Sequence, residues 1–179
     1  MTAPPATADS PANEARLDEF HVLPLDEVRA RLATCLAVPR WVDDVADGRP
    51  YADLAELRER AAASAAELTD EELDAALARH PRIGERPSAG HDGDHSRREQ
   101  AGVDPADAEL AARLMAGNHC YEKRFDRVFL IRAAGRSASE ILTELDRRLE
   151  NDAAAERLET ITALREIALL RLDKVVEAT

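Results

Sequence analysis

The sequence feature that most limits the fold is the spacing of apolar residues near the C-terminus. Between Leu158 and Val175, apolar side chains recur at helical spacing, and charged side chains fill the positions between them. This spacing gives an α-helix one continuous apolar face, which must be buried against other elements. The sequence therefore predicts a long amphipathic helix as the last element of the fold.

The composition favours helices along the rest of the chain as well. Apolar residues make up 45% of the 179 residues but aromatic residues only 3%. Ala and Leu, with the abundant Glu and Arg, are strong helix formers, and a chain of this length is about one domain. We therefore predict an all-α fold, a single-domain bundle of about seven to nine helices with a short extended segment near residues 128–134.

Start and stop signals place most of these helices. Asp53 precedes an Ala-rich stretch as an N-cap, and Thr69 with Glu72 has the pattern of a capping box. Pro81 ends the next helix directly after His80. Other helices are expected from residue 25 to before Pro39, around 41–47, over 106–125, and after a cap at Ser137 or Ser139.

The N-terminal residues differ from the rest of the chain in composition. Pro4, Pro5 and Pro11 interrupt a stretch of small residues that can bury little surface. We predict that residues 1–20 are a disordered lead-in and that residues 21–179 form the domain.

Charge and composition narrow the classes of function. The net charge of −12 repels a phosphate backbone. No stretch reaches the roughly 20 apolar residues that cross a bilayer, and the N-terminus lacks the basic and apolar regions of a secretory signal. Cys35 and Cys120 have no paired spacing, which fits a reducing compartment. We expect a cytoplasmic protein without nucleic-acid or membrane partners.

His80 is the first candidate for chemistry. It begins the segment His-Pro-Arg-Ile-Gly-Glu at a predicted helix C-terminus, where the helix dipole favours the imidazolium. A histidine held in this way could act as an acid near neutral pH. The alternative is a histidine that only caps the helix.

A second candidate cluster follows a Gly- and Pro-rich stretch at residues 82–95, which predicts a long loop. In this cluster, Glu99 can accept hydrogen bonds from ring N–H groups, and Gln100 can both donate and accept. These groups suit a small heterocycle with ureido and lactam groups. The alternative is a solvated helix start with surface ion pairs. The cluster consists of Ser96, Arg97, Arg98, Glu99 and Gln100.

The third candidate is the stretch from Asn118 to Phe125 and the apolar run that follows it up to Gly135. An extended strip with free backbone groups can hydrogen-bond the edge of a flat ligand. The alternative is a connection that fills the core. His119 and Cys120 are not expected to form a nucleophile pair, because adjacent helix residues point about 100° apart.

Two histidines in the predicted loop suggest a metal, but weakly. His91 and His95, with Asp92 and Asp94 between them, have a spacing that zinc tolerates. They lie in a glycine-rich stretch without a third fixed ligand, so we predict no metal site.

In this order and at these intervals, the three segments resemble the hallmark blocks of the 2-oxo-4-hydroxy-4-carboxy-5-ureidoimidazoline (OHCU) decarboxylase family. Trp41 and the Arg-Pro-Tyr stretch at residues 49–51 resemble the family as well, so the similarity runs from about Leu25 to the C-terminus. Two positions depart from the family pattern. Asp126 stands where the family commonly has Gly, and residues 119–120 stand where small residues are more usual.

The resemblance implies a catalytic residue and a binding surface. His80 would transfer the proton, residues 96–100 would hold the hydantoin-like ring with Glu99 at the centre, and residues 129–133 would offer backbone contacts. Arg98 or Arg124 would help to attract the substrate carboxylate. The expected substrate-binding residues are Pro81, Ser96, Arg97, Arg98, Glu99, Gln100, Arg124, Phe129, Leu130, Ile131, Arg132 and Ala133.

The implied reaction is the decarboxylation of OHCU to (S)-allantoin in urate degradation. The carbon that loses carbon dioxide lies beside a ring carbonyl, so the remaining electrons can delocalise without a cofactor. The resemblance also implies a homodimer, because family members often form one. Two alternatives stay open: a non-catalytic helical binding or regulatory protein, and an enzyme of the same fold that acts on a related ureido or imidazoline acid.

Overall fold

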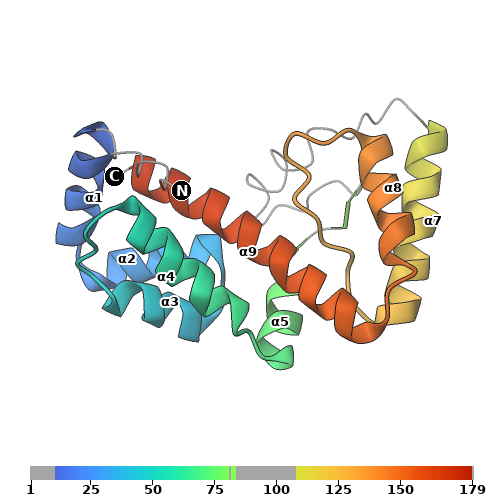
Figure 1. Cartoon of the computed structure of the whole chain (residues 1–179), viewed down its shortest axis with the longest axis horizontal. Coiled ribbons are helices and arrows are strands. Elements are labelled where there is room, and N and C mark those ends of the chain that lie inside the picture. Colours follow the sequence, from blue (N-terminus) through green and yellow to red (C-terminus); the bar gives the residue numbers. More distant parts are fainter. Residues whose placement is uncertain (1–10, 81, 84–107, 179) are drawn as a thin grey trace, which may run out of the picture. The chain divides into compact units, whose positions relative to one another are not determined.

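The computed structural model describes residues 11–80, 82–83 and 108–178, and every regular element within them is an α-helix (Figure 1). The prediction of an all-α fold is confirmed. The helices are α1 (Pro11–Val22), α2 (Leu25–Cys35), α3 (Pro39–Asp47), α4 (Leu54–Ala66), α5 (Asp70–Leu77), α7 (Ala108–Phe125), α8 (Ala138–Arg148) and α9 (Ala153–Glu177). None of these helices is both long enough and apolar enough to cross a bilayer.

The described residues form two compact units. The first unit contains residues 11–64 and 169–178, and the second contains residues 65–80, 82–83 and 108–168. Helix α9 contributes its N-terminal part to the second unit and its C-terminal part to the first. The long C-terminal helix predicted from its apolar spacing is therefore present, and it belongs to both cores.

The first unit is built around the completely buried indole of Trp41 in α3. The indole N–H donates to the carbonyl of Ala61 in α4 at 2.9 Å, so burial of this ring leaves no unsatisfied donor. Helix α4 begins as predicted, because Asp53 Oδ1 accepts from the backbone N–H of Glu56 at 2.8 Å. Helix α3 ends at Asp47 with Gly48 as its C-cap, also as predicted.

Helix α1 differs from the predicted lead-in. Residues 11–22 are helical, and Leu17 and Phe20 are buried. These two apolar residues lie three apart on one helix face, which is enough to anchor a short amphipathic helix. Residues 11–20, which the sequence predicts to be part of a disordered lead-in, are therefore helical, because burial of this pair stabilises the helix. Residues 1–10 lie outside the described part of the chain.

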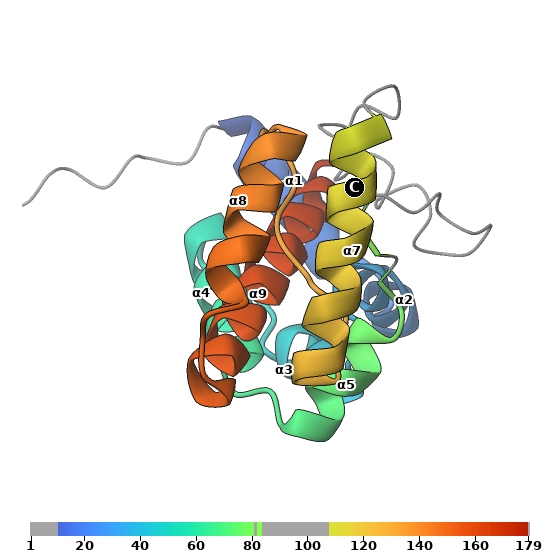
Figure 2. The ribbon, with the colours of Figure 1, turned by 90° about the vertical axis from the view of Figure 1, so that its right-hand side faces the viewer.

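The second unit contains the predicted capping boxes. Thr69 and Glu72 exchange the two reciprocal hydrogen bonds of a capping box at the start of α5, and Ser137 does the same with Glu140 at the start of α8. The structure thus selects Ser137 from the two expected caps. Helices α7 and α8 lie side by side in both views of the ribbon (Figures 1 and 2).

Candidate active site

The sequence predicts that a helix runs to His80, whereas the structure places His80 beyond the end of α5. The regular helix ends at Leu77, and the chain continues in tighter turns in which Arg79 N–H donates to Ala76 O and His80 N–H donates to Leu77 O. The helix ends three residues earlier than the expected stop at His80. The residue before a proline is disfavoured in helical conformation, so the regular helix cannot include His80.

The imidazole of His80 is half-buried and has a fixed orientation. Its Nδ1 lies 2.9 Å from the carbonyl oxygen of Ala76. A carbonyl oxygen can only accept, so Nδ1 carries a proton and Nε2 is the nitrogen that can gain or lose one. Nε2 is buried. The ring therefore does not project into bulk solvent.

The exit from α5 is attached to α7 by two side chains. Asn118 Nδ2 donates to the carbonyl of Ile83 at 2.9 Å, and the Arg82 guanidinium forms an ion pair with Glu122. Ile83 itself packs into the apolar core of the second unit. These contacts fix residues 82–83, which follow His80 closely in the chain. A cavity of about 240 Å³ lies beside them, and its lining includes Arg82, Ile83, Met115, Asn118, His119 and Glu122.

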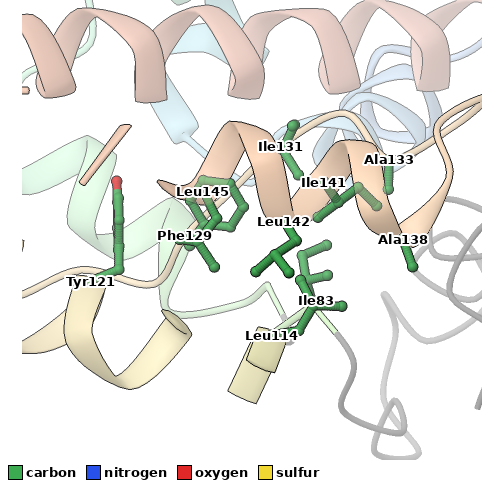
Figure 3. Packing of buried hydrophobic residues seen from close by; sticks show 10 residues of the cluster. All are labelled: Ile83, Leu114, Tyr121, Phe129, Ile131, Ala133, Ala138, Ile141, Leu142 and Leu145. Atoms are coloured by element: carbon green, nitrogen blue, oxygen red, sulfur yellow. The ribbon is translucent and has the colours of Figure 1, made fainter. Parts of the chain in front are cut away.

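The apolar run after α7 forms the non-helical segment between α7 and α8, as predicted. It begins after Asp126, which has φ 54°, and ends at Gly135, which has φ 81°. The side chains of Phe129, Ile131 and Ala133 point into the core cluster with residues from α7 and α8 (Figure 3). The alternative that this segment fills the core therefore holds for these three side chains, which leaves the main chain of the segment and the side chain of Arg132 for any ligand contact.

Sequence reasoning missed the group that holds this segment. Leu130 O accepts from Nη1 of Arg148 at 2.7 Å, and Arg148 forms a buried ion pair with Glu156. A signal was present in the sequence, because Arg148 follows Leu145 by three residues and so lies on the apolar face of α8. An arginine in that position has to find its partners inside the protein.

Two arginines of the expected site have partners in the fold. Arg132 is half-exposed and forms an ion pair with Glu166 of α9 at 3.3 Å. Arg124 Nη2 donates to Asn151 O, between α8 and α9, at 2.9 Å. The contact of Arg124 supports a role in the fold, and its role toward a substrate carboxylate stays a prediction.

Other expected site residues lie outside the described part of the chain. They are Pro81, the cluster Ser96, Arg97, Arg98, Glu99 and Gln100, and the histidines His91 and His95. His119 and Cys120 are described, and both side chains are exposed on α7.

The profile of the OHCU decarboxylase family matches residues 21–173. The chain belongs to this family. A 2-oxo-4-hydroxy-4-carboxy-5-ureidoimidazoline decarboxylase from Amia calva is 38% identical over 78 residues, which are 44% of this chain and 45% of that protein. The uric acid degradation bifunctional protein TTL of Arabidopsis thaliana is 35% identical over 85 residues, which are 45% of this chain and 26% of that protein. The matched region thus spans less than half the length of either relative.

Solved structures show that OHCU decarboxylases share this fold. A crystal structure of an OHCU decarboxylase in the presence of (S)-allantoin superposes with a TM-score of 0.68 at 23% identity, covering 81% of this chain and 96% of that one. A crystal structure of an (S)-allantoin synthase superposes with a TM-score of 0.67 at 13% identity, covering 89% of this chain and 53% of that one.

Proposed function

We propose that this chain catalyses the cofactor-independent decarboxylation of OHCU to (S)-allantoin in urate degradation. The observation that carries the proposal is the half-buried imidazole of His80, whose Nδ1 lies 2.9 Å from Ala76 O, so that Nε2 is the nitrogen that can gain or lose a proton. Membership of the OHCU decarboxylase family supports the same reaction. A cytoplasmic location and a homodimer belong to this proposal.

The reaction requires the protein to bind the substrate and to supply one proton. The bond between the ring carbon and the carboxylate breaks, carbon dioxide leaves, and the electron pair delocalises into the adjacent unsaturated ring. A proton must then be added to a ring carbon to give allantoin, so the reaction consumes one proton and needs no oxidant or reductant. His80 Nε2 supplies that proton, which is the role that proton-transferring histidines commonly have.

The face from which the proton arrives decides the handedness of the product. In this proposal, His80 delivers the proton to one face of the ring, and the main chain of residues 129–133 contacts the ring and fixes its orientation. Backbone donors aligned for developing negative charge typically contribute about 3–4 kcal/mol to catalysis. By the resemblance to the family, Glu99 and Gln100 hold the substrate ring in its binding orientation.

The test generates OHCU in the assay from urate with urate oxidase and hydroxyisourate hydrolase, and follows allantoin by circular dichroism. We expect the protein to give one allantoin enantiomer faster than OHCU decays by itself. OHCU also decays in water to racemic allantoin, so chirality rather than disappearance is the readout. Racemic product at the uncatalysed rate, from protein with a normal helical spectrum, would refute the proposed function.

A further inference from the structure

The core of the second unit contains a buried ion pair between α8 and α9. Arg148 is 2% exposed and Glu156 3% exposed. The guanidinium uses its donors in three directions: Nε to Glu156 Oε1 at 2.9 Å, Nη2 to Thr160 Oγ1 at 3.0 Å, and Nη1 to Leu130 O at 2.7 Å. It also lies 5.0 Å from the centroid of the Phe129 ring. One side chain therefore contacts two consecutive residues of the segment between α7 and α8.

Stability alone is a weak reason to bury this pair. Desolvation of two charges opposes folding, and well-packed apolar residues of similar volume are often as stable or more so. An apolar residue at position 148 could not, however, donate to the carbonyl of Leu130. That carbonyl belongs to a buried residue in a non-helical segment, where it needs a donor from elsewhere.

Glu156 is itself held from several sides. Its Oε2 accepts from Asn151 Nδ2 at 2.8 Å, and its Oε1 accepts from the hydroxyl of Tyr121. Burial, followed by the hydrogen bond to Glu156, raises the pKa of Tyr121 to about 12, so this hydroxyl stays a donor across the physiological range. The carboxylate therefore gives Arg148 a fixed anchor.

We propose that Arg148, anchored by Glu156, is a positioning residue that fixes the main chain of residues 129–133 for substrate binding. This inference rests on the proposed function, since residues 129–133 are the main-chain contact surface in that proposal. The peptide unit is planar, so fixing the carbonyl of Leu130 also restricts the orientation of the N–H of Ile131. The ring contact with Phe129 restricts the preceding residue in the same way.

The first test compares Arg148→Lys with Arg147→Lys. Arg147 is the adjacent arginine of α8, is 49% exposed, and pairs with Glu144 and Glu159 at the surface. A lysine keeps the positive charge for Glu156, but its single ammonium cannot also donate to Leu130 O and Thr160 Oγ1 in the separate directions that the guanidinium uses. We expect Arg148→Lys to lower kcat/KM about 10- to 100-fold and to reduce the enantiomeric excess of allantoin. Arg147→Lys should stay within about twofold of wild type.

The second test is milder and remains informative if Arg148→Lys does not fold. Thr160→Val removes one acceptor of the guanidinium and leaves the ion pair, whereas Thr162→Val makes the same change on the exposed face of α9. We expect Thr160→Val to lower kcat/KM about three- to tenfold, mainly through KM, and Thr162→Val to have no such effect. Kinetics are measured at a temperature where circular dichroism shows every variant to be folded.

Amide hydrogen exchange at residues 129–133 separates failure of this inference from failure of the proposed function. We expect faster exchange there in Arg148→Lys, or in Thr160→Val, than in the matched surface variants. If wild type is inactive, the proposed function fails, and exchange alone decides whether Arg148 fixes the segment. If folded Arg148→Lys and Thr160→Val keep wild-type kcat, KM, enantiomeric excess and exchange, the inference is overturned while the proposed function stands.

Discussion

At the scale of single residues, Asp126 has an unusual backbone conformation directly after α7. Asp126 follows α7, and its N–H still donates to Glu122 O at 2.8 Å. Its φ of 54° places it in the left-handed region, where a side chain is strained and glycine is not. Asp is among the residues that tolerate this conformation, so the turn after α7 forms without a glycine at position 126.

We expect Asp126→Gly to raise the free energy of unfolding by about 0.5–1 kcal/mol, because glycine relieves the left-handed strain at a small cost in unfolded-state entropy. Urea denaturation followed by circular dichroism measures this change. Asp126→Ala should be no more stable than wild type, since alanine keeps the strain. A glycine variant that is less stable than wild type would show that the Asp126 side chain contributes more to this turn than its backbone costs.

Residue types alone predicted part of the site and missed another part. His80 could be found because its signal is local: a histidine directly before a proline, at the end of a capped helix. Arg148 and Glu156 were missed because a single sequence shows a charged residue on an apolar helix face without its partner. Burial of that charge depends on where α8 and α9 meet, which residue spacing does not specify.

At the scale of the elements, the attachment of α1 depends on two side chains. Arg49 Nη1 lies within hydrogen-bond distance of the carbonyls of Phe20, His21 and Leu23, which end α1 and follow it. His21 Nε2 accepts from the backbone N–H of Tyr51 at 3.1 Å, so the ring is neutral at that nitrogen. Burial lowers the pKa of His21 from 6.5; Asp18 raises it and Arg49 lowers it further.

This attachment makes stability depend on pH. The folded-state pKa of His21 is below its unfolded value of 6.5, so its contribution to stability is complete above pH 6.5. As pH falls below 6.5, the unfolded state takes up the proton first, and the contribution is lost through the folded pKa. We expect the Tm difference between wild type and His21→Gln to change across this window. His119→Gln, an exposed histidine of α7, should keep the wild-type profile; an unchanged difference between pH 5 and pH 7.5 for His21→Gln would contradict this role.

The elements themselves were largely predictable, because spacing and caps are local. Asp53, Thr69 and Ser137 mark helix starts by side-chain hydrogen bonds that need no tertiary structure. Helix α1 was not predicted, because Leu17 and Phe20 are too few to give a periodic signal and become meaningful only once they are buried.

At the scale of the whole molecule, two compact units share α9, and the described residues of the proposed site lie in one of them. His80, residues 129–133 and the pair Arg148–Glu156 all belong to the second unit. The protein carries a net charge of −12, yet its proposed substrate is an anion, so attraction must be local and come from particular arginines rather than from the overall field. Substrate turnover is therefore expected to respond to single site residues far more than to surface charge elsewhere.

The most direct measurement is the enantiomeric excess of allantoin made by His80→Asn, with His21→Asn of the first unit as the matched control, in the coupled assay from urate at a temperature where both variants are folded. Asparagine cannot exchange a proton, so we expect kcat to fall about 10²- to 10⁴-fold and the product to be racemic, while His21→Asn gives one enantiomer at the wild-type rate. Fully stereoselective allantoin at the wild-type rate from folded His80→Asn would contradict the assignment of His80 as the proton-transferring residue.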